Sequence, residues 1–113
     1  MATIKLSAAA LADLERLQDF AELSGDPIVE ITDSNDASIG LAVFLLDAMA
    51  VLSHQPGIGR RAEQGRRELV ISRGRSGYLA KYRVYANTSP DSDQVLILRI
   101  RHQREAGYRD DEL

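Results

Sequence analysis

The chain has 113 residues, of which 44% are hydrophobic and 27% charged, and its net charge is −3. These values are typical of a globular domain and exclude a disordered chain, so residues 1–113 are expected to form one domain. The absence of cysteine excludes disulfide scaffolds and cysteine-based metal sites, and two histidines are too few for a histidine-rich metal site, so no metal or cofactor is predicted. No apolar run reaches the ~18 residues of a membrane span, and acidic residues interrupt the N-terminal segment before a signal peptide could form, which predicts a cytoplasmic protein.

The N-terminal half predicts one strand followed by two helices. Thr3–Leu6 is predicted to be a short strand, Ser7 is a suitable N-cap, and residues 8–23 follow as a helix. Residues 27–32 fit either a short extra strand or a loop, and residues 33–38 are predicted to be a turn. A second helix is predicted from about residue 37 to residue 54. Its apolar face repeats at helical spacing through Ile39, Val43, Leu46 and Ala50, and Ala42 and Met49 widen it.

The C-terminal half changes to the two-residue period of strands, after a connector rich in glycine and arginine. Strands are predicted over Glu68–Ile71, Tyr78–Ala86 and Gln94–Arg101, with a five-residue loop, Arg73–Gly77, between the first two. The order of elements predicts an α+β domain, in which an N-terminal strand and two helices pack on one face of an antiparallel sheet.

The basic residues are concentrated in the segment that contains these strands. Residues 1–59 carry a net charge of −7, residues 60–104 carry +7 and residues 105–113 carry −3. Because side chains alternate across a strand, parity places four cations on one open face, beside Val95 and Ile97, with the uncharged sets facing the helices. The four cations are Lys81, Arg83, Arg99 and Arg101. Such a face fits an anionic ligand such as RNA, or an acidic peptide; the alternative is a solvated face paired with local acids.

Five segments carry a family pattern in their order and spacing: Leu6–Leu14, Pro56–Arg60, Arg67–Ile71, Gly77–Val84 and Val95–Tyr108. Together they resemble the RelE/ParE superfamily of bacterial type II toxin–antitoxin toxins, also called plasmid stabilisation proteins. The resemblance spans nearly the whole chain and implies the RelE/ParE-like toxin fold. It also implies growth inhibition that a cognate antitoxin neutralises, with a homodimer or a toxin–antitoxin hetero-oligomer as the assembly. Residues 24–38 depart from the family, being longer and more acidic than a tight helical hairpin.

The resemblance implies one of two activities, because RelE-like members cut mRNA on the ribosome without a metal, whereas ParE-like members inhibit DNA gyrase and cut nothing. Metal-free cleavage needs a proton acceptor, cations around the phosphate and a proton donor. The resemblance makes His102 and Tyr108 the candidate catalytic residues. Glu68 and Val70 stand where the nuclease pattern has lysines, and Leu79 stands where it has an arginine. The nuclease set is therefore incomplete, which favours gyrase inhibition.

Each catalytic candidate also has a structural alternative. His102 fits equally a hydrogen-bonded histidine where the last strand turns into the tail, and Tyr108 fits a side chain that packs the tail onto the sheet. The sequence thus leaves enzymatic activity open. The alternatives to a gyrase-directed toxin are a ribosome-dependent mRNA endonuclease and a non-toxic protein-binding module.

Overall fold

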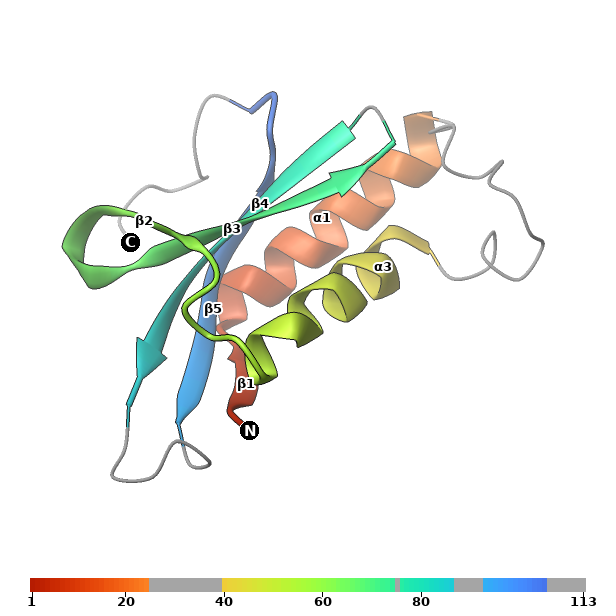
Figure 1. Cartoon of the computed structure of the whole chain (residues 1–113). Helices are drawn as coiled ribbons and strands as arrows, with labels where there is room; N and C mark the ends of the chain where they lie inside the picture. The colour runs from red at the N-terminus through yellow and green to blue at the C-terminus, as the bar shows by residue number, and fades with distance from the viewer. Residues whose placement is uncertain (25–39, 75, 87–92, 106–113) are drawn as a thin grey trace.

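The computed structural model describes residues 1–24, 40–74, 76–86 and 93–105, and every structural statement below concerns these ranges. A strand, two helices and a meander follow one another along the chain (Figure 1), which confirms the predicted α+β class. The elements are β1 (Thr3–Leu6), α1 (Ala8–Ser24), α3 (Gly40–Met49), η2 (Ala50–Ser53), β2 (Arg60–Arg61), η3 (Glu63–Gly65), β3 (Arg67–Arg73), β4 (Ser76–Tyr85) and β5 (Gln94–His102). The alternatives raised for residues 27–38 lie outside the described residues. No helix in the described part of the chain is long and apolar enough to cross a membrane.

The five strands form one mixed sheet with the order β1-β5-β4-β3-β2. β1 runs parallel to β5, and every other neighbouring pair is antiparallel. α1 and α3 lie side by side against one face of this sheet (Figure 1). β3 and β4 remain paired up to Arg73 and Ser76, so their connection is shorter than the predicted five-residue loop. Strand β2 was not predicted, because it is only two residues long.

Ser7 joins the start of α1 to the sheet, and its predicted N-cap role is confirmed. Its Oγ accepts a hydrogen bond from the Ala10 amide (3.0 Å) and donates one to the Leu98 carbonyl (2.8 Å). Its own amide donates to the Ile97 carbonyl (2.9 Å). A single residue therefore satisfies an unpaired amide of the first helical turn and fixes where α1 leaves the edge of the sheet.

The second helix buries a different face from the one predicted. Leu41, Leu45 and Met49 are buried in the core, and Leu52 of η2 continues this row. The centre of the predicted face is wrong, because Val43, Leu46 and Ala50 are exposed, and Ile39 lies outside the described residues. Met49, at the margin of the predicted face, is buried as expected. α3 is apolar around most of its circumference, so helical spacing alone did not identify the side that packs against α1 and β3.

Side-chain parity was predicted correctly for β4 and incorrectly for β5. Tyr78, Ala80 and Tyr82 of β4 are buried under the helices, as expected. In β5, however, Val95 and Ile97 are fully buried, so the prediction that they lie on an open face is wrong.

The physical reason is a β-bulge in β5. Lys81 lies opposite Arg99 and the next residue, Tyr82, lies opposite Ile97, which leaves Leu98 as an extra residue without a partner in β4. A bulge of this kind reverses the alternation of side chains along the strand. Ile100 therefore returns to the buried face that Ile97 occupies, which a strict two-residue period forbids.

Candidate functional site

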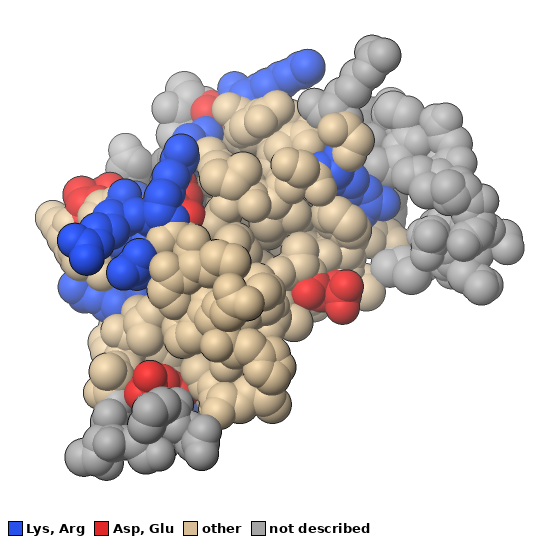
Figure 2. Space-filling model, viewed as in Figure 1, with Lys and Arg blue, Asp and Glu red and all other residues tan. Residues whose placement is uncertain are grey.

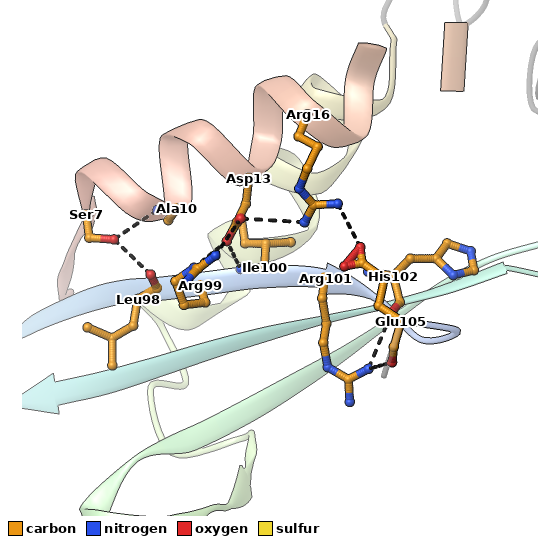
Figure 3. A network of polar contacts seen from close by, with 10 residues as sticks. All are labelled: Ser7, Ala10, Asp13, Arg16, Leu98, Arg99, Ile100, Arg101, His102 and Glu105. Atoms are coloured by element: carbon orange, nitrogen blue, oxygen red, sulfur yellow. Dashed lines mark hydrogen bonds and ion pairs between the residues drawn. The ribbon is translucent and has the colours of Figure 1, made fainter. Parts of the chain in front are cut away.

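Arg99, the third of the four predicted cations, lies in the interior rather than on an open face. Its side chain is buried against α1, where Nε donates to Asp13 Oδ2 (2.8 Å) and Nη2 donates to Asp13 Oδ1 (3.1 Å). Figure 3 shows the guanidinium of Arg99 directed at this carboxylate. The prediction that Arg99 is exposed is wrong, because Asp13 of α1 binds its guanidinium in the interior.

Asp13 extends this contact into a network between α1 and the end of β5 (Figure 3). The carboxylate also accepts from the Ile100 amide (2.8 Å) and lies 3.5 Å from Arg16 Nη2. Arg16 Nη1 in turn donates to Glu105 Oε1 at 2.8 Å. β1 pairs with β5 only as far as Ile97, so Asp13 satisfies a backbone donor that β1 does not reach.

Lys81 and Arg83 lie on the face of the sheet opposite the helices, where the turn η3 holds them. Lys81 Nζ pairs with the Glu63 carboxylate, and this hydrogen bond lowers the pKa of Glu63 below its usual value. Arg83 Nη2 donates to the Gln64 carbonyl at 2.8 Å. Gln64 and Gly65 both have positive φ, which lets the chain turn tightly over these two cations.

Arg101 supports the turn that follows β5, since its Nη1 donates to the Glu105 carbonyl at 2.7 Å. Each of the four predicted cations therefore has a partner within the protein. The structure therefore agrees better with the alternative, in which the cations are paired within the protein, than with one open basic face that lacks local partners. Binding of a ligand by any of the four stays a prediction.

His102 lies at the end of β5, and its imidazole packs edge-on against Tyr78 with 5.0 Å between ring centroids. Nδ1 accepts a hydrogen bond from the Arg104 amide (3.0 Å), so the proton of the neutral ring is on Nε2. Arg101, the preceding residue, points to the other face of the strand (Figure 3). The predicted catalytic partner Tyr108 lies outside the described residues.

A basic surface that the sequence analysis missed is built on the β2–β3 hairpin. β2 and β3 pair with Arg60 opposite Glu68 and Arg61 opposite Arg67. Figure 2 shows blue side chains gathered around this end of the sheet. This end of the sheet carries cations on both of its faces, because Arg67 lies opposite Tyr82 whereas Glu68 lies opposite Lys81. They are Arg60, Arg61, Arg66, Arg67, Lys81 and Arg83. The signal for this surface in the sequence is two Arg-Arg pairs on either side of a glycine-containing turn, in the segment that the sequence analysis describes only as a connector.

The opposite side of the molecule has a different character. A shallow groove of about 470 Å³ lies between α1 and α3, with Leu11, Leu14 and Ala42 among its lining residues. Glu15 and Asp19 lie at the same groove. Within the described residues, this groove therefore combines apolar and acidic side chains, whereas the side chains around the β2–β3 hairpin are mostly basic.

Comparisons with known proteins agree on the family. The family model described as "ParE toxin of type II toxin-antitoxin system, parDE" matches residues 4–107. Toxin RelE3 of Caulobacter vibrioides is 34% identical over 105 residues, which cover 93% of this chain and 98% of that protein. No solved structure gives a significant match. Both matches extend over nearly the whole sequence, and the chain therefore belongs to the RelE/ParE superfamily of type II toxin–antitoxin toxins, as its five sequence segments indicated.

Proposed function

We propose that this toxin inhibits DNA gyrase without cutting RNA, and that a cognate antitoxin neutralises it. The observation that supports this choice is that the described residues do not bring together a proton acceptor and free cations for phosphoryl chemistry. A toxin acting on gyrase works in the cytoplasm. Its module would stabilise a plasmid by killing cells that lose the antitoxin.

The positions around His102 show why cleavage chemistry fits poorly. A general base must present a lone pair to the 2′-hydroxyl, and the Nδ1 lone pair of His102 already accepts the Arg104 amide. Arg99, which could have balanced the charge of a phosphorane, is committed to Asp13 in the interior. On β3, Glu68 would repel a phosphate, and its carboxylate already binds Arg60.

Two assays on the purified chain test the target. In a supercoiling assay with gyrase and relaxed plasmid, the toxin should inhibit supercoiling, and His102→Gln should inhibit equally. With ribosomes and a defined mRNA, neither protein should produce cleavage fragments. Cleavage by the wild-type chain that His102→Gln abolishes, with unchanged urea unfolding, would contradict the proposal.

A ribosome-dependent mRNA endonuclease is the second candidate, and one observation favours it. The relative from Caulobacter vibrioides bears the name Toxin RelE3, and this chain keeps both His102 and Tyr108. Under this alternative, the wild-type chain cuts mRNA on the ribosome and leaves gyrase active. A chain that causes no growth arrest and affects neither target would instead support the non-toxic binding module.

For the antitoxin, we propose the groove between α1 and α3 as its binding site. Val95 and Ile97, the apolar positions first expected to bind it, are buried, whereas Leu11 in this groove is 53% exposed. Leu11→Glu should weaken the toxin–antitoxin complex at least tenfold, because it places a charge in an apolar contact. Val70→Glu is the matched control, since Val70 is also 53% exposed but lies on β3. Equal affinity of the two variants in a calorimetric titration would exclude the groove.

A further inference from the structure

We propose that the outer edge of β3 is a self-association site, at which two copies of the toxin pair their β3 strands antiparallel about a twofold axis. The partner is a second copy of this chain. The contact goes beyond gyrase inhibition and antitoxin binding, since it requires neither of those proteins.

β3 has a long stretch of edge that no strand in the described part of the chain covers. β3 is seven residues long, Arg67–Arg73, and is next to last in the sheet order. Its outer neighbour β2 pairs only with the first two of these residues (Figure 1). The connector before β2 leaves the sheet at Gly59, whose amide donates to Tyr82 Oη on the helix side at 2.9 Å. Residues 69–73 therefore lack a neighbouring strand on their outer side.

The direction of the backbone groups on this edge follows from the β2–β3 hairpin. The Ala62 amide donates to the Arg66 carbonyl at 2.8 Å, so every second residue after Arg66 points its backbone groups outward. Glu68 uses its outward groups in its pair with β2. The next outward positions are Val70 and Ser72, and both residues are exposed. Their amides and carbonyls are thus placed to pair with an added strand.

The opposite edge of the sheet is protected against such pairing, whereas the β3 edge is not. Short edge strands, lysine, proline and bulges all hinder edge-to-edge association. β1 has only four residues and exposes Lys5, and the Ala2 amide just before it donates to the Ser53 carbonyl of η2 (2.7 Å). Residues 69–73 contain neither lysine nor proline, and β3 pairs with β4 without a bulge. The sheet therefore permits pairing at β3 and hinders it at β1.

The available backbone groups allow one twofold register. Val70 pairs with Ser72 of the second copy, Ser72 pairs with Val70 of the second copy, and Ile71 lies at the axis. Each of the two pairs then exchanges both of its backbone hydrogen bonds. A shift towards Glu68 would require groups that β2 already uses. A shift the other way would bring in Gly74, which lies beyond β3 and has a positive φ of 58°.

The side chains are compatible with this register. On the helix side, Ile71 lies opposite its own copy, and Leu69 lies opposite Arg73 of the second copy. On the other face, Val70, which is 53% exposed, lies opposite Ser72. No directly opposed pair consists of two like charges, which would destabilise the contact. Pairing uses both β3 edges, so association closes at a dimer and does not continue into a filament.

The size of the contact sets its strength. It involves only residues 69–73 of each copy, whereas a standard stable interface has about 20–30 residues on each side. The dimer is therefore weak and forms in proportion to concentration. At a total concentration about tenfold above the dissociation constant, mass action leaves about one fifth of the chains monomeric. Amides that exchange with solvent only in the monomer should then exchange about fivefold more slowly.

Two measurements on the purified full chain test the proposal without gyrase or antitoxin. In sedimentation equilibrium, the apparent mass should rise from that of a monomer towards that of a dimer as the concentration increases. Amide exchange followed by NMR should slow at Val70 and Ser72 over the same range. The control amides are those of Ile4 and Leu6, which point outward from β1 and should keep their exchange rates.

A proline substitution tests the backbone contact itself. Val70→Pro removes an outward amide and should leave the chain monomeric at every concentration. The pairing of β3 with β4 is kept, because this amide does not face β4. Val70→Thr is the matched control, since it keeps the amide and a β-branched side chain and should dimerise as the wild type does. Urea unfolding checks that each variant is folded, and the exchange measurement on the wild type decides the question if Val70→Pro is not.

Three results would overturn the proposal: a monomer at all concentrations, a dimer that Val70→Pro forms as readily as the wild type, or slower exchange at Ile4 and Leu6 alone. Protection of Val70 and Ser72 by the antitoxin without any self-association would also overturn it, because the edge would then be an antitoxin site. Gyrase inhibition is measured separately, and its failure leaves this inference unaffected.

Discussion

The buried pair of Asp13 and Arg99 offers the sharpest test of how α1 is attached to the sheet. Asp13 is 3% exposed and Arg99 is 5% exposed. The carboxylate accepts from Arg99 Nε, Arg99 Nη2 and the Ile100 amide at 2.8–3.1 Å. In Asp13→Ala, the guanidinium would stay buried without its counter-charge, and the Ile100 amide would lose its acceptor. Both losses act on the folded state, because water satisfies these groups in the unfolded chain.

Removing one partner of a buried ion pair costs about 3–5 kcal/mol of the free energy of unfolding. With a urea m-value of about 1.5 kcal/mol/M, the midpoint of unfolding should fall by roughly 2–3 M. Asp13→Ala combined with Arg99→Met should be more stable than Asp13→Ala alone, because no buried charge remains unpaired. Asp19→Ala, an exposed change on the same helix, should alter stability by less than about 0.5 kcal/mol.

Urea unfolding followed by circular dichroism measures five proteins on one scale: the wild type, Asp13→Ala, Arg99→Met, the double variant and Asp19→Ala. The reasoning would be refuted if Asp13→Ala lowered the midpoint no more than Asp19→Ala does. It would also be refuted if the costs of Asp13→Ala and Arg99→Met simply added in the double variant, since contacting charges must couple. If Asp13→Ala is unfolded without urea, recovery of a cooperative transition in the double variant still measures that coupling.

Two further predictions concern the contact between the connector and β4. Gly59→Ala should lower the free energy of unfolding by about 1–3 kcal/mol, because its Cβ would lie 2.6 Å from Tyr82 Oη and 2.9 Å from the Glu68 carbonyl. Gly57→Ala is the control and should be almost neutral, since its Cβ would have its nearest neighbours at 4.0 Å. Burial raises the pKa of the Tyr82 phenol above 10.0, so the folded chain keeps this proton after the unfolded chain has lost it. Its contribution to stability is complete below about pH 10 and falls as pH rises through the folded pKa, by at most about 1.4 kcal/mol per pH unit. When the free energy of unfolding is measured from pH 8 to 11, its decrease at high pH should be smaller in Tyr82→Phe and unchanged in Tyr85→Phe. Equal pH profiles for the two variants would contradict the argument.

Elements with one clear period were predicted well from the sequence. In β4, the core residues Tyr78, Ala80 and Tyr82 alternate with Lys81 and Arg83, which identifies the face that packs against the helices, although Leu79 on the other face is buried as well. Ser7 precedes an uninterrupted helical pattern, and its cap followed from its residue type. In both cases local sequence and tertiary packing require the same arrangement.

Where the residues were apolar on both faces, the sequence did not determine the packing. Leu96 and Leu98 alternate with Val95 and Ile97 in β5, so either set could have been buried, and nothing local marked the bulge. In the same way, α3 offered Val43 and Leu46 as readily as the leucines that it buries. In both segments, contacts with distant elements determine which side chains are buried.

A signal for the buried pair was nevertheless present. Asp13 falls three residues after Ala10 and four before Leu17, and both of these are buried, so it lies within the apolar stripe of α1. Arg99 likewise interrupts an otherwise apolar strand. An acid and a base that each break an apolar row satisfy one another when the rows pack together, because neither can be buried alone. This pairing argument would have removed Arg99 from the predicted open face.

The same criterion separates the cations that hold the fold from those available to a ligand. Arg99 meets a carboxylate in the interior, so its charge is used by the fold. Arg67 and Arg83 meet backbone carbonyls, which fix their geometry and leave their charge in place. Parity on β4 and β5 counts charges and does not consider which group each charge contacts. When those contacts are considered, Arg99 no longer belongs to the predicted ligand face, whereas Arg67 and Arg83 keep an uncompensated charge at oriented guanidinium groups.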